Sequence, residues 1–482
     1  MELPFTDPPY SSNIAGIGGD DAVNVRIEVA GSGAAAQRIL VHTPGLSLFA
    51  TQNTITACRG LCTTAGGRVF QVAGVNLFEI QANGGRIARG TVSSLTGPVG
   101  MQDDGQILYI VDGVQGYTFD LIANAINAVA DPDFPDGTQF IKYANSYFLA
   151  LMPGTGFLRW SDPVDRLSWP ALNVSSAEAS PDIAVALEVL GREAWVFGTL
   201  STQVFYATED ADFAWSPVQS VAIDVGTEAP HSVAAGRDSI FFVGSGREGK
   251  GRVFRTQGYQ VVPISTPGIE GILSTAEGLA DAVGRYHSFQ GHSYYVLTIA
   301  AAERTLVYDA DLGEWHERAW RDPSTGELKR WRGTHSTFGH GLTLVGDSNG
   351  DAVYSLDGSQ YHDDKPDGSG TWIIARRRTT PHIRAGGKRI QFPDLELHGA
   401  FGDGTTTGQG SDPHCIVSHS DDGGRTWSPT RTLSVGIQGD YNSRARGLMF
   451  GMARDRMFRI TQTDPVPVAW YGLSSNAVVL PS

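Results

Sequence analysis

The feature that most constrains the fold of this chain is a loose repeat of β-hairpins between about residues 65 and 360. Each copy has a glycine or polar turn, an apolar strand, a second turn and a strand rich in aromatic residues. Their starts lie roughly 40 to 55 residues apart, which is the period of propeller blades that have four strands each. Seven copies are visible, at residues 67–80, 105–120, 145–161, 191–208, 237–256, 291–310 and 341–357.

A single hairpin cannot bury its own apolar face, whereas hairpins arranged around an axis can pack blade against blade. The alternation of Ile107, Tyr109 and Val111 supplies one such packed layer. We therefore predict an all-β fold with a β-propeller of six to eight blades over residues 41–360. The alternative, that the hairpins belong to ordinary sandwiches, is left open by their uneven spacing.

Two further regions flank the repeat. Residues 371–482 resume as seven short strand-like segments separated by turns, which predicts a C-terminal β-sandwich. The stretch 357–370, which is rich in Gly and Asp and contains one Lys, is expected to link the two domains. Residues 1–40 lack a sustained period and contain many Gly and Ala, so we expect them to form an N-terminal arm.

The charge of the chain restricts its partners. A formal net charge of −15 over 482 residues argues against a protein that grips phosphate backbones through clustered Lys and Arg. Residues 371–482 hold 13 of the 36 Lys and Arg and 9 of the 51 Asp and Glu, a balance of +4. The preceding residues hold the other 23 and 42, a balance of −19, so we expect the two parts to face different partners.

Cysteine usage and hydropathy indicate where the chain folds. Cys58, Cys62 and Cys415 are too few for an all-cysteine zinc site and odd in number for a disulfide framework. Folding in a reducing cytoplasm fits this usage. No charged and then apolar leader opens the sequence, and no unbroken apolar run approaches about 18 residues. The sequence therefore predicts neither a cleaved export signal nor a membrane-spanning segment.

The sharpest local motif resembles the Asp box of sialidases. In this pattern the aspartate caps a tight turn through backbone amides, a glycine supplies a positive φ and the tryptophan packs under the turn. The motif is structural in those enzymes, so we expect a turn-stabilising role here. Its residues are Ser420, Asp422, Gly424, Thr426 and Trp427.

No catalytic set emerges from the remaining candidates. A sialidase needs three arginines around one carboxylate, but Arg376, Arg377 and Arg378 are consecutive and point to alternating faces of a strand. We interpret them as a solvated strand end or an interface patch. The string from Gly346 to Gly350 fits a nucleophile elbow, but a strand follows it instead of the required helix. We predict no catalytic residue, no cofactor and no metal.

One region carries a family resemblance. Arg159-Trp160-Ser161 is followed by the tract 177–182 (AEASPD) and by the turn 198–203 (GTLSTQ). This order is similar to the packaged-DNA stabilisation proteins of short-tailed phages, which form the tail nozzle or hub. The likeness continues more loosely at 241–246 and 261–264, and residues 41–45 resemble the early Pro-Gly turn of that family.

The resemblance implies a structural component of the virion tail that is made in the host cytoplasm and is not an enzyme. It implies a homohexameric ring below the portal and adaptor proteins, which closes the channel after packaging and carries tail fibres or spikes. DNA would pass without sequence-specific binding, because an acidic wall repels it within a Debye length of about 8 Å. Loops 209–217 and 318–332 are candidates for holding the fibres.

Closure of a ring requires complementary surfaces on identical subunits. The basic residues of the C-terminal part are therefore candidates for pairing with an acidic neighbour. The candidate interface consists of Arg376, Arg377, Arg378, Arg444, Arg446 and Arg454. Two alternatives stay open at this stage: a sialidase-like glycoside hydrolase or depolymerase, and a non-viral propeller that serves as an interaction scaffold.

Overall fold

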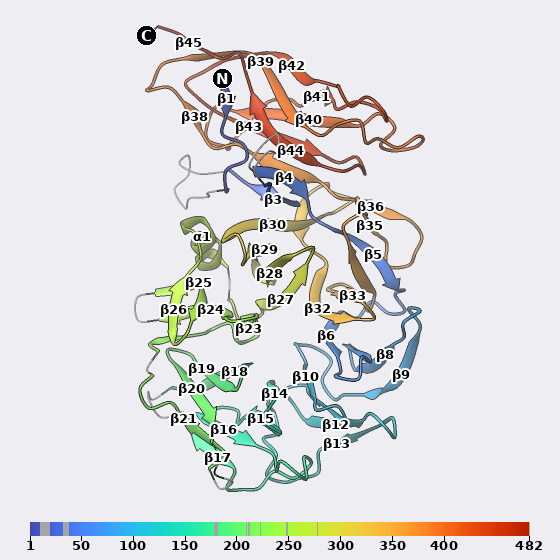
Figure 1. Cartoon of the computed structure of the whole chain (residues 1–482), viewed down its shortest axis with the longest axis vertical. Coiled ribbons are helices and arrows are strands. Elements are labelled where there is room, and N and C mark those ends of the chain that lie inside the picture. Colours follow the sequence, from blue (N-terminus) through green and yellow to red (C-terminus); the bar gives the residue numbers. More distant parts are fainter. Residues whose placement is uncertain are drawn as a thin grey trace.

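The computed structural model describes the chain except for residues 10–19, 32–37, 178–181, 209, 211–212, 222, 247–248, 277 and 482. The described residues are mostly strand, with one α-helix, α1 (Pro267–Thr275), and two short 3-10 turns, η1 (Pro230–Ser232) and η2 (Ala300–Ala302). Figure 1 shows a ring of small sheets with a β-sandwich at one end of the long axis. No helix in the described part of the chain is long and apolar enough to cross a membrane.

The first four sheets of the ring are antiparallel meanders of four strands, in which each strand pairs with the next along the chain. Their strands are β6 (Cys58–Thr63), β7 (Val69–Ala73), β8 (Asn76–Ile80) and β9 (Arg86–Thr91); β10 (Gly100–Asp103), β11 (Ile107–Val111), β12 (Gly116–Asp120) and β13 (Ala125–Ala128); β14 (Ile141–Ala144), β15 (Tyr147–Leu151), β16 (Phe157–Trp160) and β17 (Val174–Ser176); and β18 (Ala184–Leu190), β19 (Glu193–Gly198), β20 (Thr202–Ala207) and β21 (Trp215–Pro217).

The next two sheets vary this plan. In the fifth, the inner edge is divided between two short strands because η1 interrupts it, and in the sixth an extra strand pairs outside the fourth. Their strands are β22 (Val225–Gly226), β23 (Ala234–Ala235), β24 (Ile240–Gly246), β25 (Gly249–Gln257) and β26 (Gln260–Pro263); and β27 (Val283–Phe289), β28 (His292–Ile299), β29 (Arg304–Asp309), β30 (Glu314–Arg321) and β31 (Leu328–Arg330).

The last sheet closes the ring by combining the two ends of the propeller region. Its inner strands are β32 (Gly333–Gly339), β33 (Leu342–Asp347) and β34 (Val353–Asp357), and its outer strand is β5 (Gly45–Ala50). β5 pairs antiparallel with β34, with Leu46 opposite Leu356. Closure by an early strand hydrogen-bonds the two ends of the ring to each other.

The propeller prediction is confirmed, and the ring has seven blades in the described part of the chain. The seven predicted hairpins are the second and third strands of these blades. Both faces of such strands are buried: Leu108 packs with Phe70 of the preceding blade, whereas the adjacent Tyr109 packs with Phe148 of the following blade. Alternating side chains thus supply two different blade interfaces.

The sandwich consists of two sheets around one core, as predicted for the C-terminal part. Phe392, Phe458 and Trp470 are fully buried between the sheets. One sheet has the order β3-β4-β44-β39-β42, with β1 beside β44 and β45 beside β39; the other contains β37-β43-β40-β41, with β38 beside β43. The C-terminal strands are β37 (Arg376–Thr379), β38 (Ile383–Arg384), β39 (Ile390–Gly399), β40 (His414–Ser420), β41 (Arg431–Ser434), β42 (Ala445–Ala453), β43 (Asp455–Gln462), β44 (Ala469–Ser474) and β45 (Val478–Val479).

The N-terminal region differs from the predicted arm of residues 1–40. Its described residues form β1 (Glu2–Leu3), β2 (Ala22–Val23), β3 (Val25–Val29) and β4 (Arg38–His42), which pair within or next to the sandwich. The reason is burial, because Leu3, Phe5, Ile27 and Leu40 complete the sandwich core. The expected linker 357–370 likewise contains β35 (His362–Asp364), which pairs with β36 (Thr371–Ile373).

This rearrangement changes the predicted charge division. Residues 1–42 hold 2 Lys and Arg against 5 Asp and Glu, a balance of −3 that joins the +4 of residues 371–482. The sandwich is therefore nearly neutral, with a balance of +1. The intervening residues 43–370 have a balance of −16, and the two together give the net charge of −15. The acidic character of the chain belongs to the propeller.

Candidate functional site

The arginine triplet lies at the junction of the two domains. Arg376 and Arg378 are fully buried. Arg376 donates to the carbonyl oxygens of Tyr361 (2.6 Å) and Asp464 (3.1 Å). Arg378 donates to those of Phe5 (2.8 Å), Asp7 (2.8 Å) and Asp21 (3.1 Å). The prediction of a solvated strand end or interface patch is therefore wrong for these two residues, which join distant segments of the chain.

Arg377, between them, points to the other face and forms an ion pair of 2.6 Å with the Asp21 carboxylate. Its side chain is partly exposed, so it remains near the surface of the junction. Burial lowers the pKa of Arg376 to about 10 and also lowers that of Arg378. Both remain cationic at neutral pH, and the carbonyl dipoles around them replace water.

A single short strand makes the two domains continuous. Val23 of β2 lies parallel to Glu317 of β30 on one side and antiparallel to Arg377 of β37 on the other. The sixth blade and one sandwich sheet are thereby one hydrogen-bonded sheet. Figure 1 shows β30 directly beneath the strands of the sandwich.

Asn24 secures this connection. Its backbone has φ 54°, a left-handed value that asparagine tolerates better than most residues. Its amide nitrogen donates to the carbonyls of Ala319 (2.9 Å) and Ala375 (3.0 Å), and its amide oxygen accepts from the N–H of Ala319 (2.9 Å). Sequence reasoning missed this residue, because a lone Asn among apolar residues gives no sign of a partner some 300 positions away.

The Asp-box residues form a closed turn after β40. The Asp422 carboxylate accepts from the Thr426 N–H (2.9 Å) and hydroxyl (2.6 Å) and from the Ser420 hydroxyl (2.7 Å). These bonds, that of the Thr426 side chain first, lower the pKa of Asp422. Gly424 has φ 87°, and its carbonyl accepts from the Trp427 indole at 3.1 Å. The polar groups of the motif are thus engaged within the turn.

The other three arginines of the candidate interface lie around β42. Arg444 forms an ion pair with Glu396 (2.5 Å) and is largely exposed, and Arg446 pairs with Asp394. Arg454 is exposed at the end of the strand. Two of the three cations therefore already have a carboxylate partner within the chain.

β42 also carries an apolar surface. It is the last strand of its sheet, and Leu448, Met449 and Met452 on it are exposed, Met449 by 79%. Met452 lies opposite Gln391 of β39, which lies opposite the exposed Val478 of β45. We call Leu448, Met449, Met452 and Val478 the apolar edge. Figure 1 places β42 and β45 at the end of the sandwich away from the propeller.

The motifs of the resembling region fold against each other. The Asp182 carboxylate accepts from the backbone N–H groups of Thr199 (3.1 Å), Leu200 (2.7 Å) and Ser201 (2.9 Å). Burial alone would raise the pKa of Asp182, but the bond from the Thr199 hydroxyl (2.6 Å) and these backbone bonds outweigh it and lower the pKa. Residues 178–181 of the tract 177–182 lie outside the described residues, as do 209 and 211–212 of loop 209–217.

The remaining candidate residues do not come together in a catalytic or metal-binding arrangement in the described part of the chain. Ser348 lies in the turn between β33 and β34, where the Asp347 carboxylate is paired with Arg332. Cys58, Cys62 and Cys415 are unbonded thiols. Within the described ranges, no group of three or more His, Cys, Asp or Glu side chains is placed to hold a metal ion.

Comparisons with known proteins match both domains in order. A family model described as "Bacteriophage P22 Gp10, beta-propeller" matches residues 21–361, and one described as "Bacteriophage P22 Gp10, beta-sandwich" matches residues 375–477. A search of curated proteins finds no match.

Solved structures resemble the chain only distantly. The WD40 β-propeller domain of Doa1 is 8% identical with a TM-score of 0.42, over 65% of this chain and 97% of that one. The extracellular domain of the putative one-component system BT4673 from B. thetaiotaomicron is 9% identical with a TM-score of 0.44, over 80% and 47%. Likeness at this level carries no conclusion about function.

Proposed function

Because the chain belongs to the family of bacteriophage P22 Gp10, and is thus a structural component of a phage particle, we propose that it forms the tail nozzle or hub. In this role, copies of the chain form a ring below the portal and adaptor proteins and close the DNA channel after packaging. The ring also anchors tail fibres or spikes. The observation that carries the proposal is the match of both domains, in order, over residues 21–361 and 375–477.

The charge of the propeller supports a role beside moving DNA. Residues 43–370 carry −16, so several copies around a channel would present a strongly acidic surface. Such a surface repels phosphate within a Debye length of about 8 Å and leaves DNA free to slide. The buried arginines of the junction offer no surface to DNA, because they bind backbone carbonyls and, for Arg378, the Asp20 carboxylate inside the chain.

The continuous sheet that joins the propeller to the sandwich through β2 supports a role in holding a channel shut. Strand β2 continues the sixth blade into the sandwich, so force on one domain is transmitted through a hydrogen-bonded sheet. A proposed homohexamer would be built from heterologous contacts, with one surface of each subunit on a different surface of the next. The exposed apolar edge is the candidate surface for contact with the adaptor proteins.

Electron microscopy tests the proposal directly. The purified protein is imaged alone and after mixing with the portal–adaptor complex of its own virion. We expect a closed ring of copies, six in number, on the adaptor end of the complex, coaxial with the channel. Binding away from the channel axis, or no binding to the complex, would rule out a nozzle.

A second assay addresses the hydrolase alternative. The protein is incubated with host capsule polysaccharide and with sialosides, and released sugars are measured against a boiled sample. A nozzle releases no sugar above the boiled control. Steady release of sugar would instead identify the protein as a depolymerase of the phage particle. The family match by itself is compatible with that role as well.

A further inference from the structure

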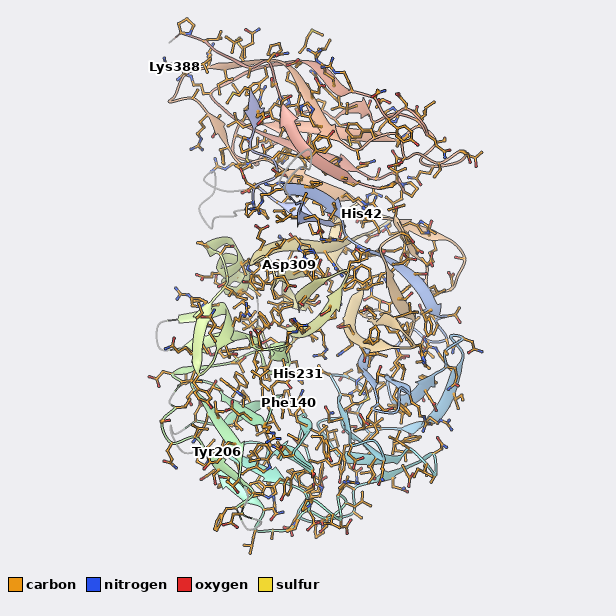
Figure 2. The ribbon with its side chains drawn as sticks, in the orientation of Figure 1. His42, Phe140, Tyr206, His231, Asp309 and Lys388 are labelled. Atoms are coloured by element: carbon orange, nitrogen blue, oxygen red, sulfur yellow. The ribbon has the colours of Figure 1, made fainter. Side chains whose placement is uncertain are left out.

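The propeller surrounds a cavity of about 280 Å³ at the centre of the ring, which is partly open to solvent. The innermost strand of every blade contributes to its lining, and residues of the segment before β14 and of η1 complete it. Figure 2 shows Phe140 and His231 from these two segments near the centre of the ring, and their rings stack at 5.1 Å. The lining is mixed: polar surface, from side chains such as Lys142 and Arg285, predominates, and Leu61, Met101 and Leu187 supply apolar wall.

The charges within this cavity do not balance. Lys142 and Glu188 form an ion pair of 2.7 Å across two neighbouring blades. Arg285 of β27 also lines the cavity, but none of the described carboxylates lies within ion-pair distance of its guanidinium. Burial and the neighbouring Arg285 lower the pKa of His231 to about 4, and they hold that of His335 well below its ordinary range, so both rings are neutral.

Arg285 is held in place by neutral acceptors alone. Its Nε donates to Nδ1 of His335 (3.1 Å), and its Nη1 donates to the carbonyl of Gly284 (2.8 Å). Nη2 lies 2.5 Å from the same imidazole nitrogen, Nδ1 of His335. These contacts use three of the five N–H groups of the guanidinium, so two are available to a further acceptor. Since Nδ1 of His335 accepts, its Nε2 carries the proton and can donate.

A second polar group in the cavity lacks a partner. The hydroxyl oxygen of Ser336, next to His335 on β32, is buried and has no hydrogen-bond partner among the residues described. A half-buried cation with no carboxylate at ion-pair distance, beside a buried hydroxyl with no described partner, favours the binding of an anion between them. Lys142 and Glu188 offset each other, so Arg285 leaves the cavity with a net positive charge.

We propose that the axial cavity binds a small molecule with one carboxylate or phosphate group, which is received by Arg285, Ser336 and His335. The apolar part of the molecule packs against Leu61, Met101 and Leu187. The guanidinium and the anionic group form a bidentate pair, which is the arrangement that arginine favours. This site lies within a single subunit, so it is independent of the proposed assembly.

Titration of the full-length protein tests the site, with sodium phosphate and sodium benzoate as probes and sodium chloride at equal ionic strength as reference. Heats of binding and melting temperature are both recorded. We expect saturable binding of one equivalent of either probe. Tighter binding of benzoate would assign the site to an organic carboxylate, and tighter binding of phosphate to a phosphate group. Effects in the wild type that do not exceed those of chloride would mean that the cavity holds only water, and would overturn the proposal.

Variants locate the binding. Arg285→Met is expected to weaken probe binding at least tenfold, whereas Arg192→Met, at an exposed turn of the fourth blade, is expected to bind as the wild type does. Should Arg285→Met fail to fold, Ser336→Ala provides the second variant, with a smaller loss of affinity. Equal binding by the wild type and by every folded cavity variant would place the anion elsewhere and contradict the assignment.

Discussion

At the scale of single residues, the most informative side chains are two buried arginines. Arg376 and Arg378 look like surface charge in the sequence, yet both lie wholly inside and donate to backbone carbonyls, and Arg378 also lies 3.7 Å from the buried Asp20 carboxylate. Their burial could not be foreseen, because their partners lie far away in the sequence, those of Arg378 within residues 1–42. The Asp box, by contrast, could be interpreted from the sequence, since all its partners lie within seven residues.

Arg378→Met is expected to destabilise the protein by about 3 kcal/mol or more, because it leaves three carbonyls without their donors. The adjacent Arg377→Met is the matched control and should cost about 1 kcal/mol or less, since its ion pair is partly exposed. Urea unfolding followed by tryptophan fluorescence measures both. Equal losses for the two variants would show that the buried carbonyl contacts contribute nothing special.

His287 predicts a dependence of stability on pH. It is buried and neither ring nitrogen has a partner among the described residues; burial, and then the nearby Arg318, lower its pKa to about 3. In the unfolded chain the imidazole takes up a proton near pH 6.5, which the folded chain does not. Its contribution is therefore present above pH 6.5 and is lost as pH falls towards 3, by about 1.4 kcal/mol per pH unit.

The variant His287→Phe removes this proton uptake. The difference in free energy of unfolding between pH 7 and pH 5 should shrink by about 2 kcal/mol relative to the wild type. Leu95→Phe, at an exposed position without an ionisable group, should leave the difference unchanged. An unaltered pH dependence in His287→Phe would mean that this histidine is protonated in the folded state.

At the scale of secondary structure, the central strands of each blade were predictable and the peripheral strands were not. Strands such as β11 bury both faces, so their residues are apolar throughout and stand out in the sequence. The innermost β6 lines the axis and has a mixed composition, while β1 and β2 have two residues each. The pairing of β1 and β2 is fixed by partners hundreds of residues away, which local patterns do not reveal.

Ring closure by β5 gives a prediction at this scale. Leu46 is buried between the sixth and the closing blades, so Leu46→Ala should destabilise the propeller by about 2 to 5 kcal/mol. Leu95→Ala, at an exposed position, should change stability by less than about 0.5 kcal/mol. Circular dichroism during urea unfolding checks both. A loss below about 1 kcal/mol for Leu46→Ala would show that the ring is stable without a packed closing strand.

At the scale of the whole molecule, the predicted division into an acidic N-terminal part and a basic C-terminal part does not correspond to the two domains. The strands from residues 1–42 bring acidic residues into the sandwich and leave it nearly neutral, while the propeller holds the negative charge. The sandwich is distinguished instead by the apolar edge with Arg454 beside it. A surface of this kind suits a contact that excludes water and is bordered by charge.

The double variant Met449→Asp with Arg454→Glu should reduce binding to the portal–adaptor complex at least tenfold. Both positions are exposed, and the left-handed backbone at Met449 (φ 62°) accommodates Asp, so folding should be retained. Val164→Asp with Arg192→Glu makes the same exchange on the propeller and is the control. Co-sedimentation with the complex measures binding, and wild-type binding by the first variant would exclude the apolar edge as the contact.

The use of early strands in late partners has a consequence for biosynthesis. Translation proceeds at about 5 to 20 residues per second, so β1 and β4 leave the ribosome tens of seconds before β44, with which both pair. β5 likewise waits for β34. During that interval Leu3, Ile27 and Leu40 have no core to enter and are open to chaperones. A chain that terminates before β34 therefore completes neither domain, and one that terminates before β44 lacks a closed sandwich, which keeps defective subunits from competing with complete ones for places in a growing particle.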